Sequence, residues 1–120
     1  LADLEIRLDP DLNSIQVFSD AMLWKVFYNL AHNTLRHAEG ATSISIFLEE
    51  GEEGIDIVYE DDGPGLPGGV LESSRGGLFL VREILHMNGM EIREEEGQGA
   101  RFVIHIPPSK LKCRVPPADD

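Results

Sequence analysis

The sequence contains one cysteine, Cys113, few basic residues and no long apolar run. A single cysteine cannot form a disulfide within the chain, which fits a reducing compartment. The 10 lysines and arginines are outnumbered by 22 aspartates and glutamates, and the net charge of −12 argues against nucleic acid or an anionic membrane surface as the main partner. The apolar runs are too short for a membrane span, and the first residues lack the pattern of a signal peptide. We therefore expect a cytoplasmic domain that makes no direct contact with a membrane.

The length of 120 residues and the hydrophobic content of 42% predict one domain with a modest core. The chain begins with Leu1 rather than methionine, so we expect it to be part of a longer protein that could carry membrane and sensor segments elsewhere. A small anionic ligand remains compatible with the acidic composition, because it requires only a local cluster of donors.

The segment from Asp20 to His37 has the pattern of an amphipathic helix, and Ser19-Asp20 offers an N-cap. Apolar spacing predicts a buried face formed by Leu23, Val26, Phe27, Leu30 and Thr34. A second set recurs at helical spacing on a neighbouring face and comprises Lys25, Asn29, Asn33, Arg36 and His37. Asparagine is a mediocre helix former, so two asparagines in register favour a binding function, although an ordinary polar surface stripe gives the same pattern.

Short segments of alternating polarity predict strands at residues 4–8, 15–18, 43–49, 55–60, 90–93 and 100–106. A second amphipathic helix over residues 78–87 follows Gly76-Gly77, an arrangement that can bind phosphate, and ends at Asn88-Gly89. Consecutive strands joined by short loops pair antiparallel. The order therefore predicts an α+β fold, a two-layer sandwich with a mixed, mostly antiparallel sheet covered on one face by helices. We expect the domain to comprise residues 1–108, followed by an irregular C-terminal tail at residues 109–120.

The strand over residues 55–60 leads directly into a carboxylate that continues its inward side. Ile55, Ile57 and Tyr59 define that side, and the alternation places Asp61 on it. Burying a carboxylate costs free energy unless it is paired or hydrogen-bonded, so Asp61 is a candidate binding residue. The glycines and prolines that follow at residues 62–67 would let a ligand ring approach the main chain, although DGPG is also a common turn.

Four segments, in this order and spacing, resemble the ATP-binding catalytic domain of sensor histidine kinases, whose fold is shared with gyrase and mismatch-repair ATPases. Residues 29–37, NLAHNTLRH, are similar to the N box of that family, and residues 61–65, DDGPG, match its DxGxG box. Residues 76–89 resemble the glycine box and its helix, with only part of the motif matching, and residues 97–102, GQGARF, resemble the closing GxGTxF segment. The resemblance covers residues 4–107 and implies the Bergerat-type ATP-binding fold.

The resemblance implies a site for ATP and Mg²⁺ formed by Asn29, Asn33, Arg36, His37, Asp61, Gly63, Gly65, Leu66, Gly77, Leu78 and Ala100. Asn33 would give a side-chain oxygen to Mg²⁺, and Asp61 would accept the adenine amino group. Arg36 would pair with the phosphates, and His37 would border the nucleotide. Gly63 and Gly65 of the DxGxG box would let the main chain pass close to the base, and Gly77 would lie by the phosphates.

Asn29 stands where the hydrolytic relatives carry glutamate as a general base for water. An amide cannot accept that proton, so Asn29 and Arg36 are expected to serve phosphoryl transfer rather than fast hydrolysis. The implied reaction transfers the γ-phosphate of ATP to a histidine on a separate dimerisation domain of the same full-length protein, which then serves a response-regulator receiver domain. None of the four histidines in this chain lies in the context of an acceptor helix.

The sequence departs from the family pattern at several positions. Ala100 replaces a threonine, which removes a hydroxyl near the adenine, and Arg75-Gly76 stand where Gly-Leu is usual. The segment between Leu66 and Gly76 is shorter than the usual lid over the phosphates. Either the lid is short, which would weaken closure over ATP, or residues of a longer mobile lid are missing from the printed sequence. We favour the second explanation, because this segment makes a poor lid.

Two other functions stay open. The first is a degenerate, non-catalytic signalling domain that binds a partner through its exposed helix. The second is an anti-sigma-factor serine kinase of the same fold, which Asn29 disfavours.

Overall fold

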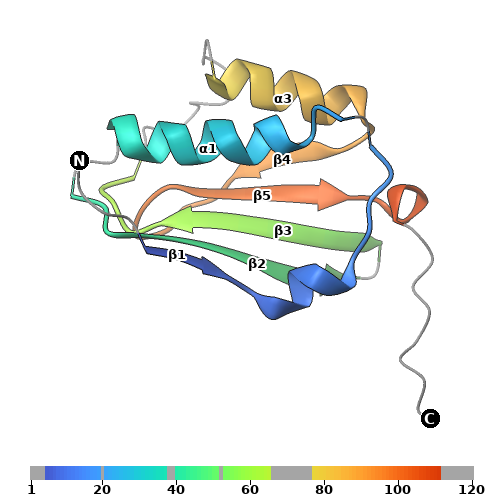
Figure 1. Ribbon diagram of the computed structural model, residues 1–120, viewed down its shortest axis with the longest axis horizontal. Coiled ribbons are helices and arrows are strands. Elements are labelled where there is room, and N and C mark those ends of the chain that lie inside the picture. The colour runs from blue at the N-terminus through green and yellow to red at the C-terminus, as the bar shows by residue number, and fades with distance from the viewer. Residues whose placement is uncertain (1–4, 20, 38–39, 52, 66–76, 112–120) are drawn as a thin grey trace.

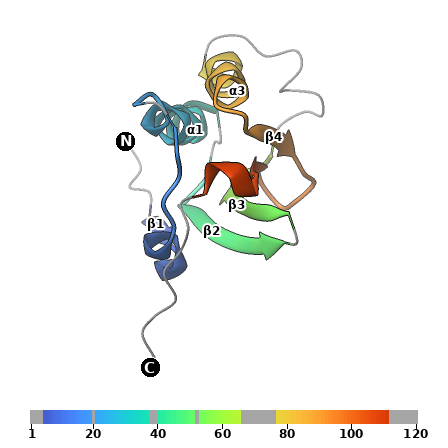
Figure 2. The same ribbon diagram turned by 90° about the vertical axis from the view of Figure 1, so that its right-hand side faces the viewer.

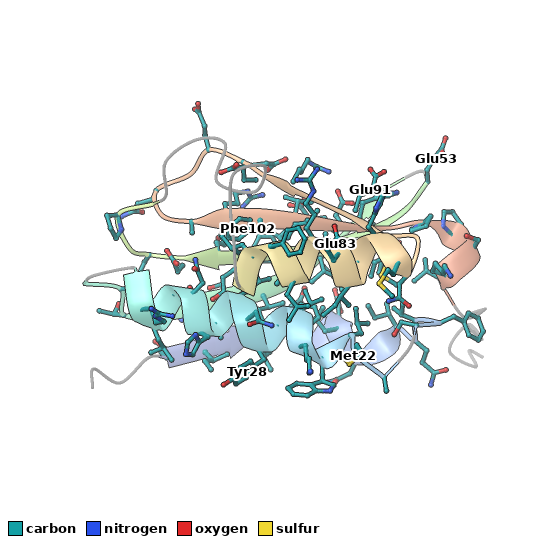
Figure 3. The ribbon with its side chains drawn as sticks, turned by 90° about the horizontal axis from the view of Figure 1, so that it is seen from above. Met22, Tyr28, Glu53, Glu83, Glu91 and Phe102 are labelled. Carbon is teal, nitrogen blue, oxygen red and sulfur yellow. The ribbon has the colours of Figure 1, made fainter. Side chains whose placement is uncertain are left out.

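The computed structural model describes residues 5–19, 21–37, 40–51, 53–65 and 77–111. Its strands are β1 (Glu5–Leu8), β2 (Ser43–Gly51), β3 (Gly54–Asp61), β4 (Glu91–Glu94) and β5 (Arg101–Ile106). They form one sheet in the order β1-β2-β3-β5-β4, and the helices α1 (Trp24–His37) and α3 (Gly77–Met87) lie side by side over one of its faces (Figures 1 and 3). The α+β sandwich expected from the sequence is confirmed.

The first strand pair gives the sheet the mixed character that was expected. β1 pairs with β2 in parallel, with Glu5 opposite Ser43, whereas the other pairs in the described sheet are antiparallel. Parallel strands need a crossover connection, and α1 supplies it between β1 and β2. The strand expected at residues 15–18 is wrong, because after the 3₁₀ turn Pro10–Ser14 this stretch makes a single bridge, between Val17 and Leu111.

Figure 2 shows the two helices as a layer over the sheet, and the hydrophobic core contains buried residues from both layers. Val26, Leu30 and Thr34 of α1 are buried, as the helical spacing predicts, while Leu23 and Phe27 are partly buried against the same cluster. Burial of such apolar side chains contributes about 25 cal/mol per Å² of area removed from water. The packing therefore fixes which flank of α1 faces the sheet and which flank carries the polar stripe.

Glycines in a left-handed conformation follow both helices. Gly40 has a φ of 85° and Gly89 a φ of 74°. After α3, the N–H of Met90 donates to the carbonyl oxygen of Leu85 at 2.8 Å, and this bond completes the helix end. The helix ends expected at these glycines agree with the structure.

The C-terminal segment begins on the domain itself. A 3₁₀ turn at Pro108–Lys110 brings the carbonyl oxygen of Lys110 within 2.7 Å of the N–H of Phe18. Residues 109–111, where the irregular tail was expected to start, therefore contact the domain, and residues 112–120 lie outside the described part. The expected lid, at residues 66–76, also lies outside it. In the described helices, no stretch has the length and apolar character needed to cross a membrane.

Candidate functional site

Asp61 ends β3 and directs its carboxylate toward α1, as its strand parity predicts. The residue is 7% exposed. Its Oδ1 accepts hydrogen bonds from the N–H groups of Gly63 and Ala100, both at 3.0 Å, and its Oδ2 accepts one from the hydroxyl of Thr34 at 2.9 Å. These donors compensate for the desolvation of the carboxylate, so a buried acidic group is stable at this position.

Two buried hydroxyls extend this network beyond Asp61. The Tyr59 hydroxyl lies 2.6 Å from Oγ1 of Thr34 and donates to the carbonyl oxygen of Leu30 at 3.0 Å. Burial raises the pKa of Tyr59 well above its usual range, so the hydroxyl keeps its proton. Sequence reasoning assigned Thr34 and Tyr59 to the core and missed their polar role, although a buried tyrosine hydroxyl generally has a partner.

Main chain from two distant motifs closes around Asp61. The bond from Ala100 spans 39 residues, and the N–H of Asp61 donates in return to the carbonyl oxygen of Ala100 at 3.0 Å. A Cβ atom on Gly99 would overlap both the carbonyl oxygen and Oδ1 of Asp61, so no other residue fits there without displacement. Gly63 is buried, and Gly65 has a φ of 88° and lies against Gly99. The glycines of both motifs therefore allow the close approach that the Asp61 site requires.

The amide stripe of α1 lies beside the N-terminus of α3. The amide nitrogen of Asn29 donates to the carbonyl oxygen of Lys25 at 2.7 Å, which fixes the side chain. A Cβ atom on Gly77 would lie 3.3 Å from Oδ1 of Asn29, so the two residues are adjacent. Asn33 is half-buried and follows at the next turn, and Arg36 is exposed. The first N–H groups of a helix and its dipole favour anions, so this corner suits a phosphate group.

The remaining predicted site residues are less informative. Leu78 is 5% exposed and belongs to the hydrophobic core. Ala100 is also buried and reaches Asp61 through its N–H group. The side chain of His37 and the whole of Leu66 lie outside the described residues.

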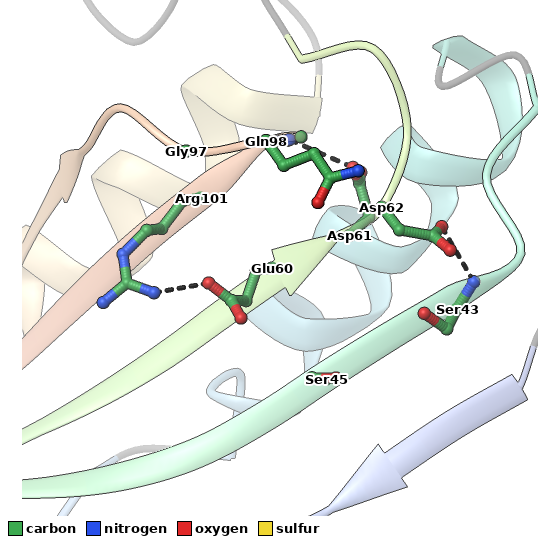
Figure 4. A pocket seen from close by; sticks show the side chains of 10 residues that line it. Ser43, Ser45, Glu60, Asp61, Asp62, Gly97, Gln98 and Arg101 are labelled. Carbon is green, nitrogen blue, oxygen red and sulfur yellow. Dashed lines mark hydrogen bonds and ion pairs between the residues drawn. The ribbon is translucent and has the colours of Figure 1, made fainter.

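The opposite face of the sheet carries a different set of polar groups at the same end (Figure 4). Asp62 is exposed there, and its carboxylate accepts hydrogen bonds from the hydroxyl of Thr42 at 2.5 Å and from the N–H groups of Thr42 and Ser43 at 2.7 and 3.0 Å. These bonds hold the pKa of Asp62 below its usual range. A cavity of about 170 Å³ opens beside it, and its lining includes Glu60 and Arg101 together with Asp61, Gly99 and Ala100. Asp61 therefore borders this cavity, while its Oδ2 accepts the hydroxyl of Thr34 on the helical side.

The donor set fits a magnesium ion that arrives with a phosphate ligand. Across the described ranges, no cluster of three or more histidine, cysteine, aspartate or glutamate side chains could hold a metal ion alone. Mg²⁺ usually keeps several water ligands and binds through one or two protein oxygens together with substrate phosphates. The amide oxygen of Asn33 is a suitable protein ligand of that kind.

The buried carboxylate, the amide stripe and the glycine-rich segments define the ATP-binding class to which the sequence motifs point. Residues 19–110 match the family model described as histidine kinase-, DNA gyrase B-, and HSP90-like ATPase. The chain belongs to this ATPase family.

Similar proteins include sensor proteins and solved ATP-binding domains. The alginate biosynthesis sensor protein KinB of Pseudomonas aeruginosa is 29% identical over 87% of this chain and 20% of its own length. The sensor protein CitS of Halalkalibacterium halodurans is 30% identical over 91% of this chain and 24% of its own length. The crystal structure of the ATP-binding domain of PrrB from Mycobacterium tuberculosis has 27% identity and a TM-score of 0.70, covering 89% of this chain and 82% of that domain. The chain thus spans between 20% and 24% of the length of these two sensor proteins.

Proposed function

We propose that this chain is the ATP-binding catalytic domain of a sensor histidine kinase. It binds ATP with Mg²⁺ and transfers the γ-phosphate to a histidine on a dimerisation domain elsewhere in the same protein. That histidine then passes the phosphoryl group to a response-regulator receiver domain. We infer a cytoplasmic location for the ATP-binding domain, because ATP is available there. The main support is Asp61, a buried carboxylate that can only accept hydrogen bonds and therefore suits the exocyclic amino group of adenine.

The phosphate end of the nucleotide would lie where α1 meets the N-terminus of α3. The N–H groups near Gly77 would bind phosphate oxygens, Asn33 would hold Mg²⁺, and the exposed Arg36 is free to approach the phosphates. Bound Mg²⁺ would neutralise phosphate charge. The side chain of Asn29 is fixed by its bond to Lys25 and cannot act as a base, so it would position the phosphates for transfer rather than activate water.

A calorimetric titration with a non-hydrolysable ATP analogue, with and without Mg²⁺, tests the nucleotide site. In Asp61→Asn an amide NH₂ group would replace an acceptor oxygen and oppose the adenine amino group, so we expect affinity to fall about 100-fold. Asp56→Asn is the matched control, because Asp56 lies on the same strand but on the opposite face, where Oδ1 contacts Nδ1 of His105 at 2.8 Å. The control should bind like the wild type. An unmodified chain that binds no analogue would contradict the proposal.

A transfer assay tests the catalytic part. The chain is mixed with radiolabelled ATP and the separately expressed acceptor domain of its own full-length protein. We expect acid-labile label on a histidine of that domain and a large loss of transfer in Arg36→Ala. Acid-stable label would indicate a serine kinase, and tight binding without any transfer would indicate a non-catalytic signalling domain.

A further inference from the structure

We propose that Thr34 and Tyr59 are positioning residues for Asp61, and that selectivity for the adenine amino group depends on both of their hydroxyls. The inference rests on the proposed function, which places adenine at Asp61. It adds two residues that hold the carboxylate of Asp61 in place without contacting the transferred phosphate.

The first step is a count of acceptor sites on Asp61. A carboxylate has four lone-pair sites, two on each oxygen. Oδ1 accepts the N–H groups of Gly63 and Ala100, so both of its sites are filled, and the main chain at Gly99 leaves no further space on that side. Oδ2 accepts the hydroxyl of Thr34 and retains one site. A ligand donor would therefore bind Oδ2, the oxygen that Thr34 holds.

The second step concerns the proton of Thr34. A threonine hydroxyl in a helix commonly donates to the carbonyl oxygen four residues earlier, which for Thr34 is that of Leu30. Each hydroxyl carries one proton, and that of Thr34 is donated to Asp61. The proton of Tyr59 therefore lies between two acceptors, Oγ1 of Thr34 at 2.6 Å and the Leu30 carbonyl oxygen at 3.0 Å. Tyr59 thereby donates to Thr34 and occupies its alternative partner, so that the Thr34 proton remains directed at Asp61.

The third step is the absence of another side-chain donor. Among the described residues, Thr34 provides the side-chain hydrogen bond to Asp61, and the other two donors are main-chain groups that no substitution of their own side chains removes. Ala100 offers a methyl group where a hydroxyl would otherwise be available. The orientation of Oδ2 consequently depends on α1, 27 residues away in sequence.

The test compares ATP with purine riboside triphosphate, which lacks the 6-amino group and keeps the rest of the nucleotide. Thr34→Val removes the hydroxyl at similar volume, and we expect it to weaken ATP binding about tenfold while leaving purine riboside triphosphate binding unchanged. Thr34→Ser keeps the hydroxyl and should retain most of the ATP affinity. Tyr59→Phe should reproduce the loss of Thr34→Val, because Thr34 can then donate to Leu30 instead.

The double variant Thr34→Val, Tyr59→Phe should lose no more than either single variant, because both act through one hydrogen bond. Urea unfolding of each variant shows that it is folded, and Thr34→Ser and Tyr59→Phe provide the test should Thr34→Val not fold. Equal weakening of both nucleotides, no weakening of ATP, or a loss in Thr34→Ser as large as in Thr34→Val would overturn the inference. A wild-type chain that does not prefer ATP to purine riboside triphosphate would instead overturn the placement of adenine at Asp61.

Discussion

Asp61 and Asp62 are consecutive carboxylates at the end of β3, and the sheet directs them to opposite faces. Asp61 is buried beneath α1, held by two main-chain N–H groups and the hydroxyl of Thr34. Asp62 is exposed and joins the end of β3 to the start of β2 through Thr42 and Ser43. The difference shows that identical groups one residue apart acquire different surroundings, one a buried set of donors and the other an exposed link between strands, because successive side chains point to opposite faces and meet different segments.

The largest difference between the two carboxylates is expected from Gly99→Ala, which disrupts the surroundings of Asp61. The added Cβ would overlap main-chain and side-chain oxygens of Asp61. Relief of the overlap should lower the free energy of unfolding by about 1–3 kcal/mol and abolish binding of the ATP analogue. Gly97→Ala is the control, because its Cβ would lie 3.6 Å from Arg101, an ordinary contact. Urea unfolding and calorimetry measure both quantities, and wild-type values for Gly99→Ala would contradict the role assigned to this glycine.

A smaller, pH-dependent effect is expected from Asp62→Asn. Hydrogen bonds from Thr42 and Ser43 depress the folded-state pKa of Asp62 below its unfolded value of about 3.9. The stabilisation is therefore present above about pH 4 and is lost as the pH falls toward the folded-state pKa. We expect Asp62→Asn to lower the urea midpoint at neutral pH, the gap to the wild type to close in acid, and affinity for the ATP analogue to stay unchanged. A gap that remains constant into acid, or a loss of nucleotide affinity, would refute the separation of the two faces.

The smallest effect is expected from the ion pairs on the outer face. Arg101 contacts Glu60 and also Glu95, where Nε lies 3.0 Å from the carboxylate, and both acidic side chains are more than a third exposed. Such pairs contribute about 0.2–1 kcal/mol and are screened by salt. Glu95→Gln should reduce the free energy of unfolding within that range, with a smaller difference at high salt. Glu96→Gln, at the exposed neighbouring position, is the control, and a loss of nucleotide affinity in Glu95→Gln would show that the faces are coupled.

Local patterns predicted much of the site. The alternation of Ile55, Ile57 and Tyr59 placed Asp61 on the inward side, and the helical spacing of α1 placed Thr34 in the core and Asn29 on the adjoining polar stripe. These inferences hold because side-chain direction in a strand or helix repeats with a fixed period. The roles of Asn33, Arg36 and Gly77 toward a nucleotide remain predictions.

Other features depended on contacts between distant segments. The sequence pattern predicted a mixed sheet, whereas the structure shows that β1 and β2 are the parallel pair, connected through α1. Residues 15–18 alternate like a strand, yet among the described residues they form only an isolated bridge, between Val17 and Leu111, outside the sheet. Alternation reports which side chains can be buried, but pairing requires a neighbouring strand with free main-chain groups.

The sequence by itself determined that this chain carries an inward carboxylate, an amide stripe on a helix and glycine-rich segments in a fixed order, because residue type and period are local properties. Only the tertiary structure decided that Thr34 meets Asp61 across 27 residues, and that the N–H of Ala100 meets it across 39. The physical reason is that burying a carboxylate costs free energy unless it is hydrogen-bonded, and two of its donors belong to α1 and to the residue before β5, whose positions against β3 the sequence spacing cannot determine.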